Sequence, residues 1–256
     1  MENNNGNSVK SILKAFAIIE TLNEAGPLSI SELSQALQMD KGTVHRLINT
    51  VRQAGYVIQN PETKKYANSI KLFEIGQKVV PRTGLYDLAR PHIEALAQAT
   101  GESINLGIVK DNEIIYIDKK EGMSTIKVGI KIGTSIPMYC TGMGKAVLAF
   151  MRPSIRDEII SRIQYVRYSV NTPMDQKKVE QELDDCRQKG YSMDNEEYVN
   201  DLISFGAPIF GYKGEPVAAI SISFPKSRFT EEYAREFPEM VKKAAADISR
   251  QMGYIA

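Results

Sequence analysis

The chain has 256 residues, of which 43% are apolar and 25% are charged, enough for one large soluble domain or two modest ones. Its formal net charge of +1 argues against a generally basic nucleic-acid coat and against an acidic disordered tail. Two cysteines and two histidines are too few for a disulfide framework or a zinc cluster, so we expect a reducing cytoplasm, no metal and no cofactor.

The polar residues 1–7 are expected to form a disordered lead, because they lack the basic and apolar regions of a signal peptide. The sequence has no apolar run of about 18 residues, so we expect no membrane-spanning helix and no membrane partner. From Val9 the apolar residues have helical spacing, which predicts an amphipathic helix that Ser8 caps and that Gly26-Pro27 ends.

Two shorter helices are predicted next. Ser29 and Glu32 have the spacing of a capping box, which indicates a helix over residues 30–37. A third helix over residues 41–54 follows Asp40, a favourable N-cap, and precedes a glycine that suits the C-terminal end.

Residues 56–59 and 64–67 flank a turn and predict a β-hairpin. Three helices followed by a hairpin are the plan of a winged helix-turn-helix. We therefore assign residues 8–69 to such a domain and residues 70–84 to a linker helix.

The remaining residues, 85–256, alternate between helical and strand patterns. The sequence predicts helices over 85–100, 142–151, 154–163, 176–189 and 231–252, and strands over 103–109, 113–119, 125–130, 191–193, 204–210 and 216–224. Helices that flank a mixed or antiparallel sheet are typical of an α+β sensor domain. The fold class is therefore α+β, with an N-terminal winged helix-turn-helix and a C-terminal α/β domain.

Positive charge is concentrated in one segment although the whole chain is nearly neutral. Residues 41–71 hold six basic side chains and one acidic one, on the predicted third helix, the hairpin and the start of the linker. This is either a solvated basic face or a set of contacts to DNA phosphates. The position favours DNA, because a helix-turn-helix inserts its second helix into the major groove while the wing contacts the backbone.

The candidate DNA-binding residues share small size, polarity or positive charge. Arg46 has the chemistry to pair with guanine or with phosphate. The full set is Ser29, Lys41, Gly42, Thr43, His45, Arg46, Asn49, Thr50, Arg52, Lys64 and Lys65.

Several motifs in fixed order resemble one family along nearly the whole chain. The stretches are residues 30–37, 41–48, 55–57, 65–66 and 71–76 in the first part, and 137–146, 194–198, 206–210 and 221–225 in the second. These motifs identify the chain as similar to the IclR-type (isocitrate-lyase-regulator-type) bacterial transcription factors. Within the family it is most similar to the ketodeoxygluconate (pectin-degradation) repressors, through residues 71–76, 190–197, 221–225 and 251–254.

The resemblance implies a homodimer, often a dimer of dimers, that binds near-palindromic operator DNA. It also implies that the C-terminal domain is GAF-like and binds a small carboxylate or sugar-acid effector. The effector-binding positions carried over are Tyr139, Gly142, Met143, Asp194, Glu197, Ser204, Ser221 and Ser223. Two positions depart from the family: Asp201 stands where glycine is usual, which puts the local turn in doubt, and Ser204 stands where cysteine is frequent.

The residues themselves leave the effector site open. Gly142 and Gly144 precede a helix start whose N–H groups suit an anion, but a plain loop-to-helix turn has the same pattern. Ser221 and Ser223 lie two apart on an apolar strand and so share a face, where they bind a polar ligand or bond across strands. The segment is not a phosphate-binding P-loop, because the glycine spacing fails and Ala146 replaces the hydroxyl residue.

An enzyme with a winged-helix domain is the competing class. Cys140 is the candidate nucleophile, but neither His45 nor His92 has a reason to lie beside it as a base. We therefore expect no catalytic residue and no enzymatic activity. A third class is an interaction module whose winged helix binds protein.

Overall fold

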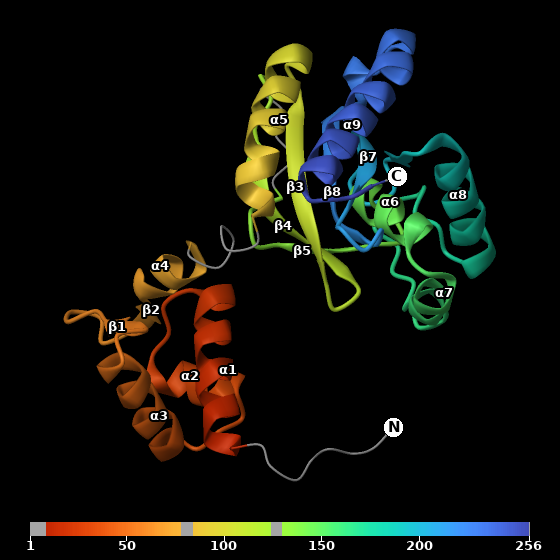
Figure 1. Cartoon of the computed structure of the whole chain (residues 1–256). Helices are drawn as coiled ribbons and strands as arrows, with labels where there is room; N and C mark the ends of the chain where they lie inside the picture. The colour runs from red at the N-terminus through yellow and green to blue at the C-terminus, as the bar shows by residue number, and fades with distance from the viewer. Residues whose placement is uncertain (1–8, 78–83, 124–129, 256) are drawn as a thin grey trace. The chain divides into compact units, whose positions relative to one another are not determined.

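The computed structural model describes residues 9–77, 84–123 and 130–255 (Figure 1). The chain divides into two compact units, Met1–Arg82 and Thr83–Ala256. Among the described residues, no helix combines the length and the apolar character that crossing a membrane requires.

The described part of the first unit contains four helices and a two-stranded antiparallel hairpin. The elements are α1 (Lys10–Ala25), α2 (Ile30–Ala36), α3 (Lys41–Gln53), β1 (Val57–Gln59), β2 (Tyr66–Asn68) and α4 (Lys71–Gln77). One apolar core joins α1, α2, α3 and the hairpin: Ile18, Leu22, Leu33, Val44, Leu47, Ile48, Val51, Val57 and Tyr66. This is the predicted winged helix-turn-helix plan.

The ends of α2 and α3 follow from their caps. The Ser29 side chain accepts the backbone N–H of Glu32 while the Glu32 carboxylate accepts that of Ser29, which confirms the capping box. Asp40 Oδ1 accepts the Thr43 N–H at 2.8 Å and starts α3. Gly55 follows that helix with φ +83°, a conformation that glycine adopts without strain.

The second unit is built on a six-stranded antiparallel sheet of order β5-β4-β3-β8-β7-β6. The strands are β3 (Ser103–Lys110), β4 (Glu113–Lys120), β5 (Ser135–Pro137), β6 (Ser192–Asn195), β7 (Leu202–Phe210) and β8 (Pro216–Pro225). The pairing of β3 with β8 joins the N-terminal and C-terminal halves of the unit.

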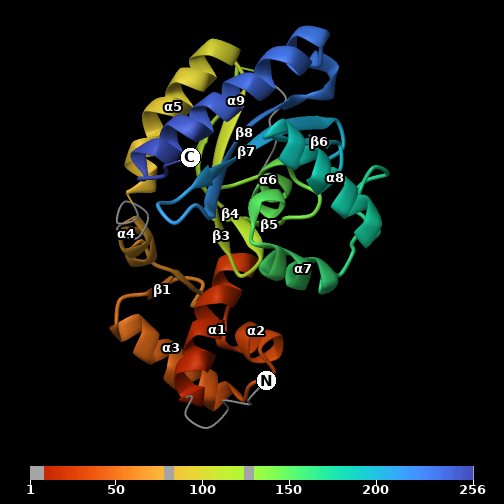
Figure 2. The ribbon, with the colours of Figure 1, turned by 45° about the vertical axis from the view of Figure 1, so that its right-hand side comes forward.

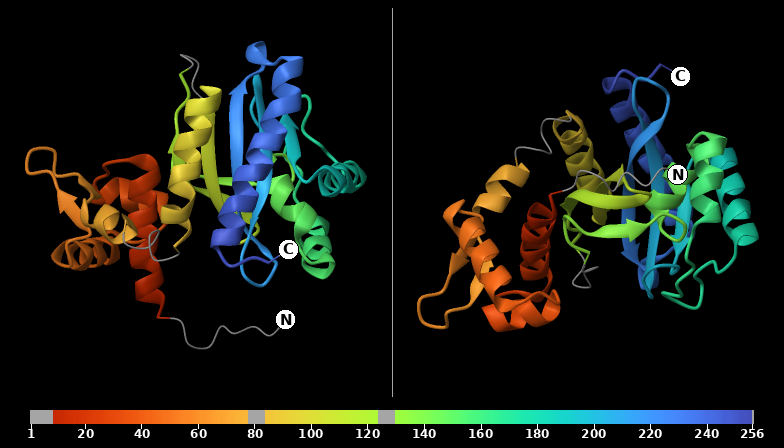
Figure 3. Two further views of the ribbon diagram at one scale, coloured as in Figure 1. Left: turned by 45° about the horizontal axis from the view of Figure 1, so that its top comes forward. Right: turned by 90° about the horizontal axis from the view of Figure 1, so that it is seen from below.

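Helices cover both faces of this sheet. On one face, α5 (Leu85–Thr100) and α9 (Glu231–Gln251) lie side by side (Figures 1 and 2). On the other face, α6 (Gly142–Phe150) packs on β7 and β8 and contacts α8 (Gln176–Lys189), with α7 (Pro153–Ser161) nearby (Figure 3). The α+β class is confirmed.

Most predicted elements agree with the structure within a few residues; β2 begins two residues later than predicted, at Tyr66, and β6 ends two residues later, at Asn195. The strand β5 was not predicted, β7 begins two residues earlier at Leu202, and α7 begins at Pro153 and ends at Ser161. The predicted cap Ser8, most of the strand at 125–130 and residues 78–83 of the linker lie outside the described residues. Of the linker helix, the described part is α4, which belongs to the first unit.

Candidate DNA interface and effector site

The face of α3 opposite the core is polar and exposed. Lys41, Gly42, His45, Arg46, Thr50 and Arg52 are exposed, and Thr43 and Asn49 are half-buried, while the apolar residues of the helix are buried. His45 and Asn49 lie within hydrogen-bond distance, with Asn49 Nδ2 3.2 Å from His45 Nε2. The Thr50 hydroxyl donates to the Arg46 carbonyl, so it is committed within the helix.

Two of the predicted residues outside α3 have structural partners. Ser29 is the N-cap of α2, and Lys65 on the hairpin forms an ion pair with Glu32 at 3.0 Å. The hydrogen bond from the Ser29 N–H, followed by that from Lys65, lowers the pKa of Glu32 to about 2. Lys64 at the hairpin tip is exposed and has φ +58°.

The second unit has a buried polar surface on the sheet face beneath α6. Strand register places its members in two adjacent rows, because cross-strand partners share a face. One row is Lys119, Asn105, Ser221, Gly206 and Ser192; the other is Ser103, Ser223, Ser204 and Asp194. The structure therefore brings together Asp194, Ser204, Ser221 and Ser223 from three strands.

The start of α6 lies directly on this surface. A Cβ at Gly142 would lie 2.6 Å from Ser204 Oγ, and one at Gly206 would lie 2.4 Å from the Gly142 carbonyl oxygen. Close backbone approach therefore restricts position 206 to glycine, whereas a side chain at position 142 would displace the Ser204 hydroxyl. Thr141 caps the helix by accepting the Gly144 N–H at 3.2 Å, and the Met143 side chain is buried.

Asn105 was not among the predicted residues, yet it contacts two of them. Its Nδ2 donates to Ser221 Oγ at 3.2 Å and to Ser223 Oγ at 3.0 Å, and all three side chains are buried. The two serine hydroxyls are therefore hydrogen-bonded across the strands, but they only accept from Asn105 and do not donate to it. The available signal was a polar residue within the otherwise apolar stretch 104–109.

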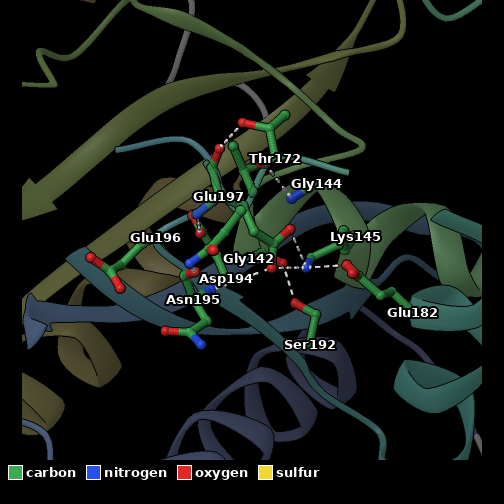
Figure 4. Close-up of polar contacts among 12 residues, drawn as sticks. Gly142, Gly144, Lys145, Thr172, Glu182, Ser192, Asp194, Asn195, Glu196 and Glu197 are labelled. Atoms are coloured by element: carbon green, nitrogen blue, oxygen red, sulfur yellow. Dashed lines mark hydrogen bonds and ion pairs between the residues drawn. The ribbon is translucent and has the colours of Figure 1, made fainter. Parts of the chain in front are cut away.

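Asp194 lies in β6, and Glu197 lies in the turn that follows this strand. Asp194 Oδ1 accepts the Glu197 N–H at 2.7 Å, and the Thr172 hydroxyl donates to the Glu197 carbonyl (Figure 4). Burial, and then the negative charge of Glu197, raises the pKa of Asp194 to about 7. Burial also raises the pKa of Glu197.

Lys145 of α6 holds this turn in place through a buried ion pair. Its Nζ lies 2.5 Å and 2.6 Å from the two Glu197 carboxylate oxygens and 2.7 Å from Glu182 Oε2 on α8 (Figure 4). Burial lowers the pKa of Lys145, but the charges of Glu197 and Glu182 outweigh it, and the net shift is upward. The ammonium group is therefore positively charged although only 2% of the side chain is exposed.

Tyr139 is not part of this polar surface. Its hydroxyl donates to the Val166 carbonyl and accepts the Val166 N–H, so both roles are occupied by backbone. The side chain lines a separate hollow of about 290 Å³ with Arg162 and Tyr168.

The turn at Asp201 has the geometry that glycine would favour. Asp201 has φ +59°, which aspartate tolerates better than most residues. Its N–H donates to Glu196 Oε2 at 3.1 Å and its carbonyl accepts the Lys226 N–H at 2.8 Å. The turn is therefore formed with aspartate in the position.

Cys140 is fully buried next to this region, and burial raises the pKa of its thiol. A thiol with a raised pKa is a poor nucleophile at neutral pH. His45 lies in the first unit and His92 lies on α5, on the opposite face of the sheet from α6. Cys140 therefore has the environment of a packed core residue.

Two family models account for most of the chain. The IclR helix-turn-helix domain matches residues 11–61, and the C-terminal domain of the bacterial transcriptional regulator IclR matches residues 77–250. The chain belongs to the IclR family.

Relatives and solved structures of the IclR family agree with this assignment. The regulator KdgR of Dickeya chrysanthemi is 38% identical over 247 residues, which is 96% of this chain and 81% of that protein. KdgR of Escherichia coli K12 is 37% identical, over 96% of this chain and 94% of its own length.

The crystal structure of the Thermotoga maritima IclR matches with a TM-score of 0.80 at 31% identity, over 96% of this chain and all of that one. The C-terminal domain of E. coli KdgR matches with a TM-score of 0.61 at 35% identity, over 66% of this chain and 99% of that one. These relatives are transcriptional regulators, and this IclR-family chain is a DNA-binding transcriptional regulator rather than an enzyme.

Proposed function

We propose that this regulator represses sugar-acid catabolism genes in the cytoplasm and responds to a small carboxylate such as 2-keto-3-deoxygluconate. The effector binds the buried polar surface beneath α6, formed around Asp194, Ser204, Ser221 and Ser223. Effector binding shifts the protein between two states that differ in their affinity for the operator. The shift is no larger than the difference in effector affinity between these two states.

The unused hydrogen-bonding capacity of the polar surface supports this proposal most directly. In the described part of the chain, the Ser204 hydroxyl makes no hydrogen bond, and the Ser221 and Ser223 hydroxyls donate none. Buried polar groups in native proteins normally have their partners. A hydroxylated carboxylate supplies the missing acceptors and donors, whereas a purely apolar ligand would leave these groups unpaired.

Operator binding is assigned to α3 and the hairpin. The exposed cations Lys41, Arg46 and Arg52 on α3, and Lys64 on the hairpin, provide phosphate contacts, while His45 and Asn49 face outward between them. Ser29 and Lys65 act by holding α2 against the hairpin.

We infer that two copies associate through α1. Ile12, Leu13 and Phe16 share one face of this helix, and Val9 precedes them at its N-cap. All four are between 52% and 58% exposed, although Ile18 and Leu22 already supply the buried face of the helix. A helix with a second, exposed apolar face is typical of an interface. A second copy of the same helix is the partner that a two-fold-symmetric operator requires.

A thermal-shift screen of the full-length protein tests the function. We expect 2-keto-3-deoxygluconate to raise the Tm and to change the mobility of promoter DNA complexes at the same concentrations. If another carboxylate or an aromatic acid does so instead, the sugar-acid assignment is wrong. If no promoter DNA is retarded at low salt, the operator assignment fails and a protein-binding winged helix is favoured.

A further inference from the structure

We propose that Asn105 sets the hydrogen-bond polarity of the effector site, so that Ser221 and Ser223 act as a paired donor for one carboxylate group. This inference rests on the proposed function and adds a positioning residue to it. The residue acts through the two serines and does not itself touch the effector.

The first step is the use of the amide. Both N–H groups of the Asn105 Nδ2 atom are directed at hydroxyl oxygens, Ser221 Oγ at 3.2 Å and Ser223 Oγ at 3.0 Å. A hydroxyl that accepts a hydrogen bond in this way retains its own hydrogen for another partner. Because neither hydroxyl donates to a described residue, both hydrogens are available to a ligand.

The second step is the orientation of the amide, since a reversed amide would accept from the serines and leave only their lone pairs exposed. Lys119 is the direct cross-strand partner of Asn105 on the side away from the serines. Its side chain is largely buried, in an ion pair with Glu121 at 2.8 Å. Lys119 Nζ also donates to the Ile130 carbonyl, and the Asn105 amide has its NH₂ group on the serine side.

The third step is the match to a carboxylate. The two Oγ atoms share one nitrogen as donor, so they lie within about 6 Å of each other, a separation that the two oxygens of one carboxylate can bridge. Hydrogen bonds to a charged acceptor are stronger than neutral ones. Asp194 lies at the far end of the second row, and its carboxylate suits hydroxyl groups of the effector rather than the effector carboxylate.

The experiment measures binding of 2-keto-3-deoxygluconate to the full-length protein by titration calorimetry. Asn105→Ala removes the donor, and we expect roughly a tenfold rise in Kd. Asn105→Asp has the same shape, but its carboxylate accepts from both serines and adds negative charge. We expect roughly a hundredfold rise or more for this variant.

A double-mutant cycle separates positioning from structural support. If Asn105 acts through the serines, Asn105→Ala adds little to the S221A/S223A background, less than about twofold. An equal tenfold loss in both backgrounds would overturn the proposal, as would unchanged affinity in the single variants. Asn112→Asp makes the same charge change at the exposed β3–β4 turn and serves as the matched control.

Two further outcomes keep the inference distinct from the proposed function. If the wild-type protein binds no sugar acid, the proposed function fails, and the Asn105 inference fails with it. If the wild type binds and Asn105→Asp binds equally well, only the inference fails. Circular dichroism and the Tm of each variant show whether a loss of affinity reflects a loss of fold.

Discussion

At the scale of single residues, Asp194 has the most consequential environment in the second unit. Its carboxyl is buried beside Glu197, and both Glu197 carboxylate oxygens bind Lys145, whose charge also acts on Asp194. Ionising Asp194 therefore adds a negative charge beside Lys145, which already pairs with Glu197 and with Glu182, the latter shared with Lys178. Its pKa of about 7 lies close to physiological pH.

We expect Asp194 to make the protein less stable as pH rises. Folding raises its pKa from the ordinary value of 3.8 to about 7. Between pH 3.8 and pH 7 the folded protein therefore holds a proton that the unfolded chain lacks. The free energy of unfolding then falls as pH increases through that window. Asp194→Asn removes this contribution, so its Tm should fall less than that of the wild type between pH 5.5 and about pH 8.

The comparison is a series of Tm measurements in matched buffers. Asp184→Asn is the control, because Asp184 is exposed on α8 and paired with Arg187. The control should retain the wild-type slope. Identical pH slopes for Asp194→Asn and the wild type would contradict the assignment.

At the scale of elements, Lys145 connects three segments. It belongs to α6, whose first turn lies on the polar surface, and it binds Glu182 of α8 and Glu197 of the turn after β6. A buried ion pair contributes little net stability, but it fixes the arrangement of the groups it joins. A ligand that contacts both Gly142 and Asp194 would therefore act on a single connected unit.

The ends of elements were predictable wherever a cap determines them. Residues 176–189 were predicted without error, because Asp175 accepts the Lys178 N–H and Gly190 ends the helix with φ +78°. The strand β5 has only three residues, Ser-Ile-Pro, too few to show an alternating pattern.

The partners across the sheet were not predictable in the same way. Periodicity shows that Ser221 and Ser223 share a face, but it does not show that Asn105, more than a hundred positions away, lies opposite them. That contact depends on the register of β3 against β8. Likewise, a lysine in the apolar helix α6 gives no indication of which carboxylates bind it.

The proposed recognition helix α3 leads to a prediction for DNA binding. Arg46 is exposed on the outer face of α3, where its guanidinium can reach a base edge or a phosphate. We expect Arg46→Ala to weaken operator binding roughly ten- to a hundredfold, measured by fluorescence anisotropy. A base contact would also relax sequence preference, whereas a phosphate contact would reduce the salt dependence.

Arg235→Ala provides a matched control, because Arg235 is an exposed arginine on α9 in the other unit. This variant should bind the operator like the wild type. Full operator affinity of Arg46→Ala would count against α3 as the helix that reads DNA.

At the scale of the whole molecule, the charge distribution separates the two tasks of the chain. The net charge of +1 arises from units of unlike composition, with six basic residues and one acidic residue in the segment 41–71. The second unit instead concentrates buried polar groups on one sheet face. In the proposed dimer, each helix-turn-helix contacts one half-site of the operator.

Assembly through α1 gives the last prediction. Phe16→Glu places a charge in the centre of the exposed apolar face formed with Val9, Ile12 and Leu13, leaving the core residues Ile18 and Leu22 unchanged. Burying this unpaired charge in a two-fold interface costs about 3–5 kcal/mol, so the dimer should dissociate at concentrations at which the wild type is dimeric. Operator affinity should fall as the dimer dissociates, because two half-sites are no longer bound together.

Light scattering after size exclusion measures the mass, and Val170→Glu, at an 85% exposed position in the second unit, is the control. A Phe16→Glu protein with the mass and operator affinity of the wild type would show that α1 does not form the interface.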